Sequence, residues 1–99
     1  MEIVINKQGT TLTVAPKGRM DSVTSGEVES RINEALSEEV TTLRLDMTGV
    51  DFISSKAIRV MLVLHNNMAK KGGLVLSGIN NSVREVLKMS ALLDVFHVE

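Results

Sequence analysis

The residues best suited to chemistry in this chain are two adjacent serines, Ser54 and Ser55. They follow an apolar segment at 43–45 and an acidic turn, and an apolar helical pattern begins shortly after them at Ile58. Side-chain hydroxyls at the start of a helix accept hydrogen bonds from its free backbone N–H groups, and the same groups can bind a phosphate. The serine pair is therefore interpreted either as a helix cap or as part of a phosphate-binding site.

The hydrophobic pattern predicts the elements that must position this pair. Alternating apolar residues predict strands, whereas apolar residues three or four positions apart predict helices. Strands are expected near 3–5, 12–16, 43–45, 74–76 and 95–98, and helices at 24–38, from 58 to the glycines at 72–73, and from 80–82 onward. A Gly-Thr pair at 9–10 indicates a hairpin turn. Capping boxes are indicated by Thr24 with Glu27 and by Ser82 with Glu85.

Strands that alternate with helices predict an α/β fold, because each helix supplies the crossover that a parallel strand pair needs. The length suits one domain, residues 1–99. We expect a mixed, largely parallel sheet of about four to five strands with helices packed on it. Binding sites in such sheets lie beyond the carboxyl ends of the strands, where loops lead into helices. The acidic turn and the serine pair occupy this location.

Composition excludes several classes of function. The chain has 11 basic and 12 acidic residues, so its formal charge of −1 does not favour nucleic acid. It has no cysteine, its two histidines lack metal-ligand spacing, and no glycine-rich phosphate loop is present. We therefore expect no enzymatic activity, no metal and no cofactor. The N-terminus is unlike a signal peptide and no apolar run reaches membrane-spanning length, so we expect a cytoplasmic protein without direct membrane insertion.

The order of motifs around the serine pair resembles a known family. The central pattern is Leu45-Asp46, Gly49-Val50, Phe52-Ile53 and Ser54-Ser55, followed by Lys56, Ala57 and the apolar helix. Further matches are Gly18-Arg19-Met20-Asp21 with Thr24, Gly72-Gly73 before an apolar strand, and Met89-Ser90-Ala91-Leu92. Together these segments resemble the STAS domain, named for sulfate transporters and anti-sigma factor antagonists. The resemblance covers nearly the whole chain, and its length suits a free-standing anti-sigma factor antagonist.

The resemblance implies a protein-binding switch without catalysis of its own. An anti-sigma factor that is also a serine kinase would bind the unmodified domain, release a sigma factor, and transfer phosphate from its own bound ATP. The alignment implies that Ser55 is the phosphoacceptor, with Ser54 as the alternative at a position more often occupied by Asp. Lys56 and Ala57 depart from the small residue and the glycine usual in the family. Phosphorylation adds about 1.5 to 2 negative charges, which would expel a partner packed there.

The partner-binding surface is expected around this junction and along the outer side of the following helix. Its predicted residues are Asp21, Asp51, Ser54, Ser55, Lys56, Arg59, Val60 and Val63. Asp21 either caps the first helix or contacts the kinase, and Asp46 ties down the turn through backbone amides. Lys56 either pairs with a phosphate on Ser55 or is solvated.

The second helix offers two interpretations of its valines. Steps of about 100° per residue place Ala57, Met61, Leu62, Leu64, His65, Met68 and Ala69 on one core-facing arc. Val60 and Val63 fall outside this arc and flank Arg59. They form a docking surface, or another helix covers them.

A second functional hypothesis remains open for the chain as a whole. It is a constitutive STAS scaffold or interaction subunit, for example of a lipid-transport complex, in which the departures at Ser54, Lys56 and Ala57 reflect loss of a regulated site. For either function we expect a monomer or a weak homodimer.

Overall fold

Strands and helices alternate along the chain, as the hydrophobic pattern predicts, with one additional strand. The computed structural model describes residues 1–99. The elements are β1 (Glu2–Gln8), β2 (Thr11–Met20), α1 (Thr24–Ala35), β3 (Thr42–Asp46), β4 (Val50–Ile53), α2 (Ser55–Met68), β5 (Gly73–Ser77), α3 (Asn81–Met89) and β6 (His97–Val98). The predicted α/β fold is confirmed. The hydrophobic pattern predicted no strand at 50–53, where the structure has β4.

The six strands form one mixed sheet in the order β1-β2-β3-β5-β6, with β4 paired to β2. β1 and β2 are the predicted antiparallel hairpin, and all other pairs are parallel. β2 is long enough to pair with two parallel strands. Its first half pairs with β3, and its end at 18–20 pairs with β4. The second neighbour is why the sheet exceeds the four to five strands expected.

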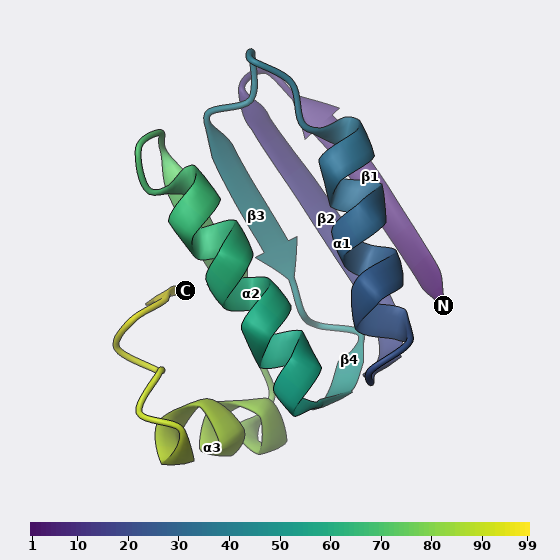
Figure 1. Ribbon diagram of the computed structural model, residues 1–99, viewed down its shortest axis with the longest axis vertical. Coiled ribbons are helices and arrows are strands. Elements are labelled where there is room, and N and C mark those ends of the chain that lie inside the picture. Colours follow the sequence, from purple (N-terminus) through teal and green to yellow (C-terminus); the bar gives the residue numbers. More distant parts are fainter.

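Two of the three helices, α1 and α2, lie over one face of the sheet (Figure 1). Successive crossovers lead from β2 to β3, from β3 to β5 and from β5 to β6, always in the same direction across the sheet. Because such crossovers are right-handed, their helices gather on the same side. Figure 1 shows α1 and α2 side by side over the strands. α3 lies below them, at the end of the molecule that also holds β4 (Figure 1). The starts of α1 and α2 therefore meet at this end.

The core fills the space between the sheet and these helices. Strand residues that alternate in sequence supply one side of it, and helix residues three or four positions apart supply the other. The buried set includes Leu12 and Val14 of β2, Leu43 and Leu45 of β3, Leu74 and Leu76 of β5, Val28 and Ile32 of α1, Met61 and Leu64 of α2, and Val83 and Leu87 of α3. Each large apolar side chain buried here stabilises the fold by about 1.5–3 kcal/mol.

The helix caps differ from the predicted capping boxes. The hydroxyl of Thr24 bonds to Asp21 and to the carbonyl of Arg19 instead of to the first turn that follows it. The cap of α3 is Asn80, whose side chain accepts a hydrogen bond from the N–H of Val83 at 2.8 Å. Both helices start where expected, but Asp21 and Asn80 supply the caps, because Asp and Asn cap as well as Ser and Thr do.

Candidate functional site

The turn between β3 and β4 is held by its own side chains. Asp46 Oδ1 accepts hydrogen bonds from the backbone N–H of Thr48 at 3.0 Å and from its hydroxyl at 2.6 Å. These two bonds, that of the hydroxyl first, lower the pKa of Asp46. The predicted role of Asp46 in tying down the turn is therefore confirmed. Asn80 adds a second support, since its side-chain amide donates to the carbonyl of Val50 at 3.0 Å.

A β-bulge in β4 determines how Asp51 is presented. Gly18 pairs with Val50, but the next residue of β2, Arg19, pairs with Phe52, so Asp51 is the extra residue. A bulge of this kind interrupts the alternation of side chains and re-aims them. Val50 and Ile53 are consequently both buried, whereas Asp51 is exposed.

The two serines of the junction differ in their environments. Ser54 is the N-cap of α2, and its hydroxyl oxygen accepts a hydrogen bond from the backbone N–H of Ala57 at 3.2 Å. Its own backbone N–H donates to the carbonyl of Met20 at 2.9 Å. Ser55 is the first residue of α2, is exposed, and has no hydrogen bond from its hydroxyl to the rest of the chain. Ser54 therefore has a structural role, and the hydroxyl of Ser55 is free for chemistry.

Asp21 caps α1 beside this junction. Its Oδ1 accepts hydrogen bonds from the backbone N–H of Thr24 at 2.9 Å, from that of Val23 at 3.0 Å and from the hydroxyl of Thr24 at 3.1 Å. These bonds, the backbone bond of Thr24 first, lower the pKa of Asp21. The capping interpretation of Asp21 is confirmed. The bond from Ser54 to Met20 places this cap at the same end of the molecule as the start of α2.

Lys56 is exposed and extends towards α1. A Cβ atom built on Gly26 would lie 3.5 Å from Lys56 Nζ, so the ammonium group reaches the first turn of α1. The absence of a side chain at Gly26 leaves the space that Lys56 occupies. Lys56 thus bridges the starts of the two helices, and it has no ion-pair partner in the chain.

The outer side of α2 is narrower than the sequence predicts. Val63 is 41% exposed and Arg59 is also exposed, as expected, but Val60 is only 4% exposed and belongs to the core. The prediction that Val60 contributes to a partner-binding surface is wrong, and the alternative that another helix covers this residue is confirmed. Residues four apart share a side of a helix, so Val60 lies on the same side as Lys56, which faces α1. Packing of α1 beside α2 therefore buries Val60. A second prediction for this helix is also wrong, since Ala69 was expected in the core and is exposed.

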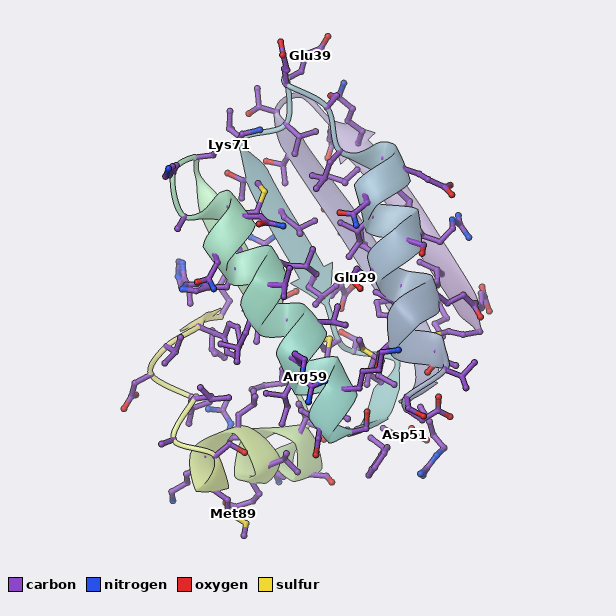
Figure 2. All side chains as sticks on the ribbon, viewed as in Figure 1. Glu29, Glu39, Asp51, Arg59, Lys71 and Met89 are labelled. Carbon is purple, nitrogen blue, oxygen red and sulfur yellow. The ribbon has the colours of Figure 1, made fainter.

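The predicted residues that remain at the surface gather at one end of the molecule. Asp21, Asp51, Ser55 and Lys56 lie where β2, β4, α1 and α2 meet, and Arg59 follows one turn along α2. Figure 2 shows Asp51 and Arg59 at this end, opposite Glu39 and Lys71. We call these five residues the junction surface. Val63 is a further turn along the same helix.

The sequence interpretation missed two residues of this region, Arg19 and Phe52. The guanidinium of Arg19 lies over the Phe52 ring, with Cζ 4.2 Å from the ring centroid. The two residues are 33 positions apart, and only the pairing of β2 with β4 brings them together. No local pattern in the sequence could have indicated this contact.

Three further observations concern other kinds of site. The surface has no pocket. No three His, Cys, Asp or Glu side chains are close enough together to hold a metal ion. None of the helices combines the length and apolar character needed to cross a membrane.

Comparison with known proteins supports the arrangement described above. The chain is 27% identical over 99 residues to a Bordetella bronchiseptica protein named "Putative anti-sigma factor antagonist BtrV", covering 99% of this chain and 85% of BtrV. Its fold is similar to that of an anti-sigma factor antagonist from Mycobacterium paratuberculosis, with a TM-score of 0.87, 18% identity, and coverage of 98% of this chain and 83% of that one.

The anti-sigma factor antagonist SpoIIAA of Bacillus has the same fold in two forms. The unphosphorylated form matches with a TM-score of 0.82 at 18% identity, covering 99% of this chain and 88% of SpoIIAA. The phosphorylated form matches with a TM-score of 0.75 at 17% identity, covering 99% and 91%. The family model of the STAS domain matches residues 2–99. Because this match spans almost the entire chain, the protein belongs to the STAS domain family.

Proposed function

We propose that this protein is an anti-sigma factor antagonist, which binds an anti-sigma factor and so frees a sigma factor. Family membership supports the fold on which this function rests. The relatives named as anti-sigma factor antagonists match over nearly the full chain, which supports the partner class. The junction surface is the proposed contact region, because it combines exposed charges with the free hydroxyl of Ser55.

We further propose that phosphorylation of Ser55 by the anti-sigma factor, acting as a kinase with its own bound ATP, switches this binding off. The observation that carries the proposal is the difference between the two serines. The hydroxyl of Ser54 accepts a hydrogen bond within the helix cap, whereas Ser55 is exposed and unbonded. A kinase can therefore modify Ser55 without breaking the cap, so the alternative acceptor Ser54 is disfavoured.

The charge of a phosphate explains how such a switch would act. Phosphorylation adds about 1.5 to 2 negative charges to the first turn of α2, where the backbone N–H groups and the helix dipole favour an anion. The domain would therefore keep its fold. A partner packed closely over the free hydroxyl of Ser55 would clash with the added phosphate and would have to desolvate its charge, which weakens binding. We expect the switch to change the interface with little refolding.

The test combines the protein with a purified anti-sigma factor kinase from the same organism and ATP. Mass spectrometry is expected to place one phosphate on Ser55. Ser55→Ala is expected to keep wild-type affinity and lose phosphorylation, whereas Ser55→Asp should weaken binding through its added charge. Isothermal titration calorimetry measures both affinities.

Ser54→Ala is the matched control for the neighbouring hydroxyl. It removes a cap worth about 1 kcal/mol of stability but should leave Ser55 as a phosphorylation site. Phosphate found only on Ser54, or equal affinity of the Ala and Asp variants at position 55, would contradict the switch. Copurification with transporter subunits and with no anti-sigma factor would instead favour the constitutive scaffold.

A further inference from the structure

Arg19 and Phe52 form a stacked pair on the outer side of the short β2–β4 ladder. Their Cα atoms are direct partners in the parallel register, and the next pair along the ladder is Met20 with Ile53. Met20 and Ile53 are buried, so Arg19 and Phe52 belong to the opposite side of these strands. The guanidinium carbon lies 4.2 Å from the ring centroid, which is cation–π stacking distance.

Two structural features hold this pair in place. The bulge at Asp51 breaks the alternation of β4, which allows Val50 to be buried while Phe52 supports Arg19. The backbone carbonyl of Arg19 accepts a hydrogen bond from the hydroxyl of Thr24 at 2.5 Å. Both the backbone and the side-chain end of Arg19 are therefore positioned before any partner arrives.

The N–H donors of the Arg19 guanidinium are not used within the chain. Arg19 is exposed and forms neither an ion pair nor a side-chain hydrogen bond. Asp21, its neighbour two residues along the chain, directs Oδ1 to Val23 and Thr24 instead. Stacking on a ring covers one face of a guanidinium and leaves the donors at its edge free to bind an acceptor.

The stacked pair is continuous with the junction surface. Met20 follows Arg19 directly, and its carbonyl accepts the hydrogen bond from the N–H of Ser54. Val23, which is 75% exposed, adds an apolar side chain beside Asp21. A partner that covers Ser55 and Asp21 would therefore also reach the guanidinium of Arg19.

We propose that Arg19, held on Phe52, binds an Asp or Glu carboxylate of the anti-sigma factor and helps to select which anti-sigma factor is accepted. This inference rests on the proposed function. A guanidinium binds a carboxylate through two parallel N–H···O bonds, which gives geometric specificity as well as affinity. An arginine that is already fixed loses less conformational freedom on binding, and arginines of this kind are frequent hot spots of interfaces.

The primary test compares Arg19→Glu with Arg31→Glu. Arg31 is also an exposed, unpaired arginine, but it lies in the middle of α1 and is not stacked on an aromatic ring. Both substitutions change the net charge equally. The probe is the purified anti-sigma factor that binds the wild-type chain. Surface plasmon resonance should show that Arg19→Glu raises Kd by roughly 10- to 100-fold, mainly through faster dissociation, while Arg31→Glu changes Kd less than about twofold.

Two conservative variants separate the stacked geometry from charge alone. Arg19→Lys keeps the charge but loses the fork of donors, and Phe52→Leu removes the ring that holds it. Both should weaken binding, by less than Arg19→Glu does, with unchanged thermal unfolding for Arg19→Lys. Individual Asp and Glu residues of the anti-sigma factor are then replaced by Arg. One of these anti-sigma factor variants should bind the Arg19→Glu variant with restored affinity.

Three results would overturn the inference. They are equal Kd values for Arg19→Glu and Arg31→Glu, wild-type affinity of Arg19→Lys, or an effect of Arg19→Glu confined to the association rate and abolished by high salt. The last result would mean long-range steering in place of a direct contact. If the wild-type chain itself bound no anti-sigma factor, the proposed function would fail together with the inference.

Discussion

Asp21 illustrates how one residue serves the fold and the site together. One carboxylate oxygen accepts three hydrogen bonds at the start of α1, and this fixes the carboxylate at the edge of the junction surface. The two interpretations that the sequence left open therefore do not exclude each other. A cap that is rigidly held can also present its charge to a partner.

The cap predicts a specific pH dependence of stability. The hydrogen bonds lower the pKa of Asp21 below its ordinary value of 3.8, so the ionised form stabilises the folded state at higher pH. This contribution should be fully present above that value and lost as the pH falls through the lowered pKa. Asp21→Asn should therefore be less stable than wild type at about pH 7, and the difference should shrink at about pH 3.

Urea unfolding at the two pH values measures this difference. Asp51→Asn is the control, because Asp51 is an exposed carboxylate without hydrogen bonds in the chain. As a surface substitution that removes no contact, it should change stability little at either pH. A difference between Asp21→Asn and wild type that is equally large in acid would show that the ionised carboxylate of Asp21 does not stabilise the cap.

At the scale of elements, α2 is shaped by contacts on more than one side. Its inner side packs on the sheet, its Lys56–Val60 side faces α1, and His65 stacks edge-on against Phe96 at a centroid distance of 5.6 Å. The outer strip that remains exposed carries Ser55, Arg59 and Val63, followed by Asn66 and Asn67, with Lys56 at its edge. A partner that binds α2 must therefore approach along this strip.

Val60 and Val63 provide a matched test of this placement. Val60→Ala should lower the free energy of unfolding by about 2 kcal/mol, because it removes two buried methyl groups and leaves a cavity. Val63→Ala should change stability by less than about 0.5 kcal/mol. Under the proposed function, Val63→Ala should nevertheless weaken binding to the anti-sigma factor.

Urea unfolding and calorimetric titration of the two variants provide the measurements. Equal losses of stability would contradict the burial of Val60 and the exposure of Val63. Unchanged affinity of Val63→Ala would remove Val63 from the interface and leave the junction surface as the proposed contact region.

At the scale of the whole molecule, the C-terminal segment completes the sheet. Phe96 is 4% exposed and belongs to the main core, and β6 pairs with β5. The backbone N–H of Glu99 donates to the carbonyl of Leu76 at 2.8 Å, and the carboxylate of Glu99 accepts two hydrogen bonds from Arg44. These hydrogen bonds hold the last residues of the chain against β5 and β3.

Loss of the Phe96 side chain should therefore loosen this segment and destabilise the domain. Phe96→Ala is expected to lower the free energy of unfolding by about 3–5 kcal/mol, as for other large core side chains. Phe96→Leu, which retains most of the apolar volume, should cost less. Hydrogen exchange of the Glu99 amide should accelerate in Phe96→Ala, and an unchanged rate would show that Phe96 does not anchor β6.

The local sequence pattern determined most of the elements and the capping role of Ser54. Spacing of apolar residues depends only on near neighbours, so it predicted the hairpin, the three helices, and the strands β3 and β5. The position of Ser54 before an apolar helix was likewise sufficient to predict the cap that the structure confirms. The resemblance to the STAS domain depended on the order of such local segments and was confirmed for residues 2–99.

Tertiary structure alone decided the features that involve distant segments. β4 was missed because the bulge at Asp51 removes the alternation by which a strand is recognised. For Val60 the sequence left a docking surface and coverage by another helix both open, because one helical period cannot show that α1 covers a second side of α2. The stacking of Arg19 on Phe52 depends on the pairing of strands that are far apart in sequence, and such pairing is determined by how the whole chain packs.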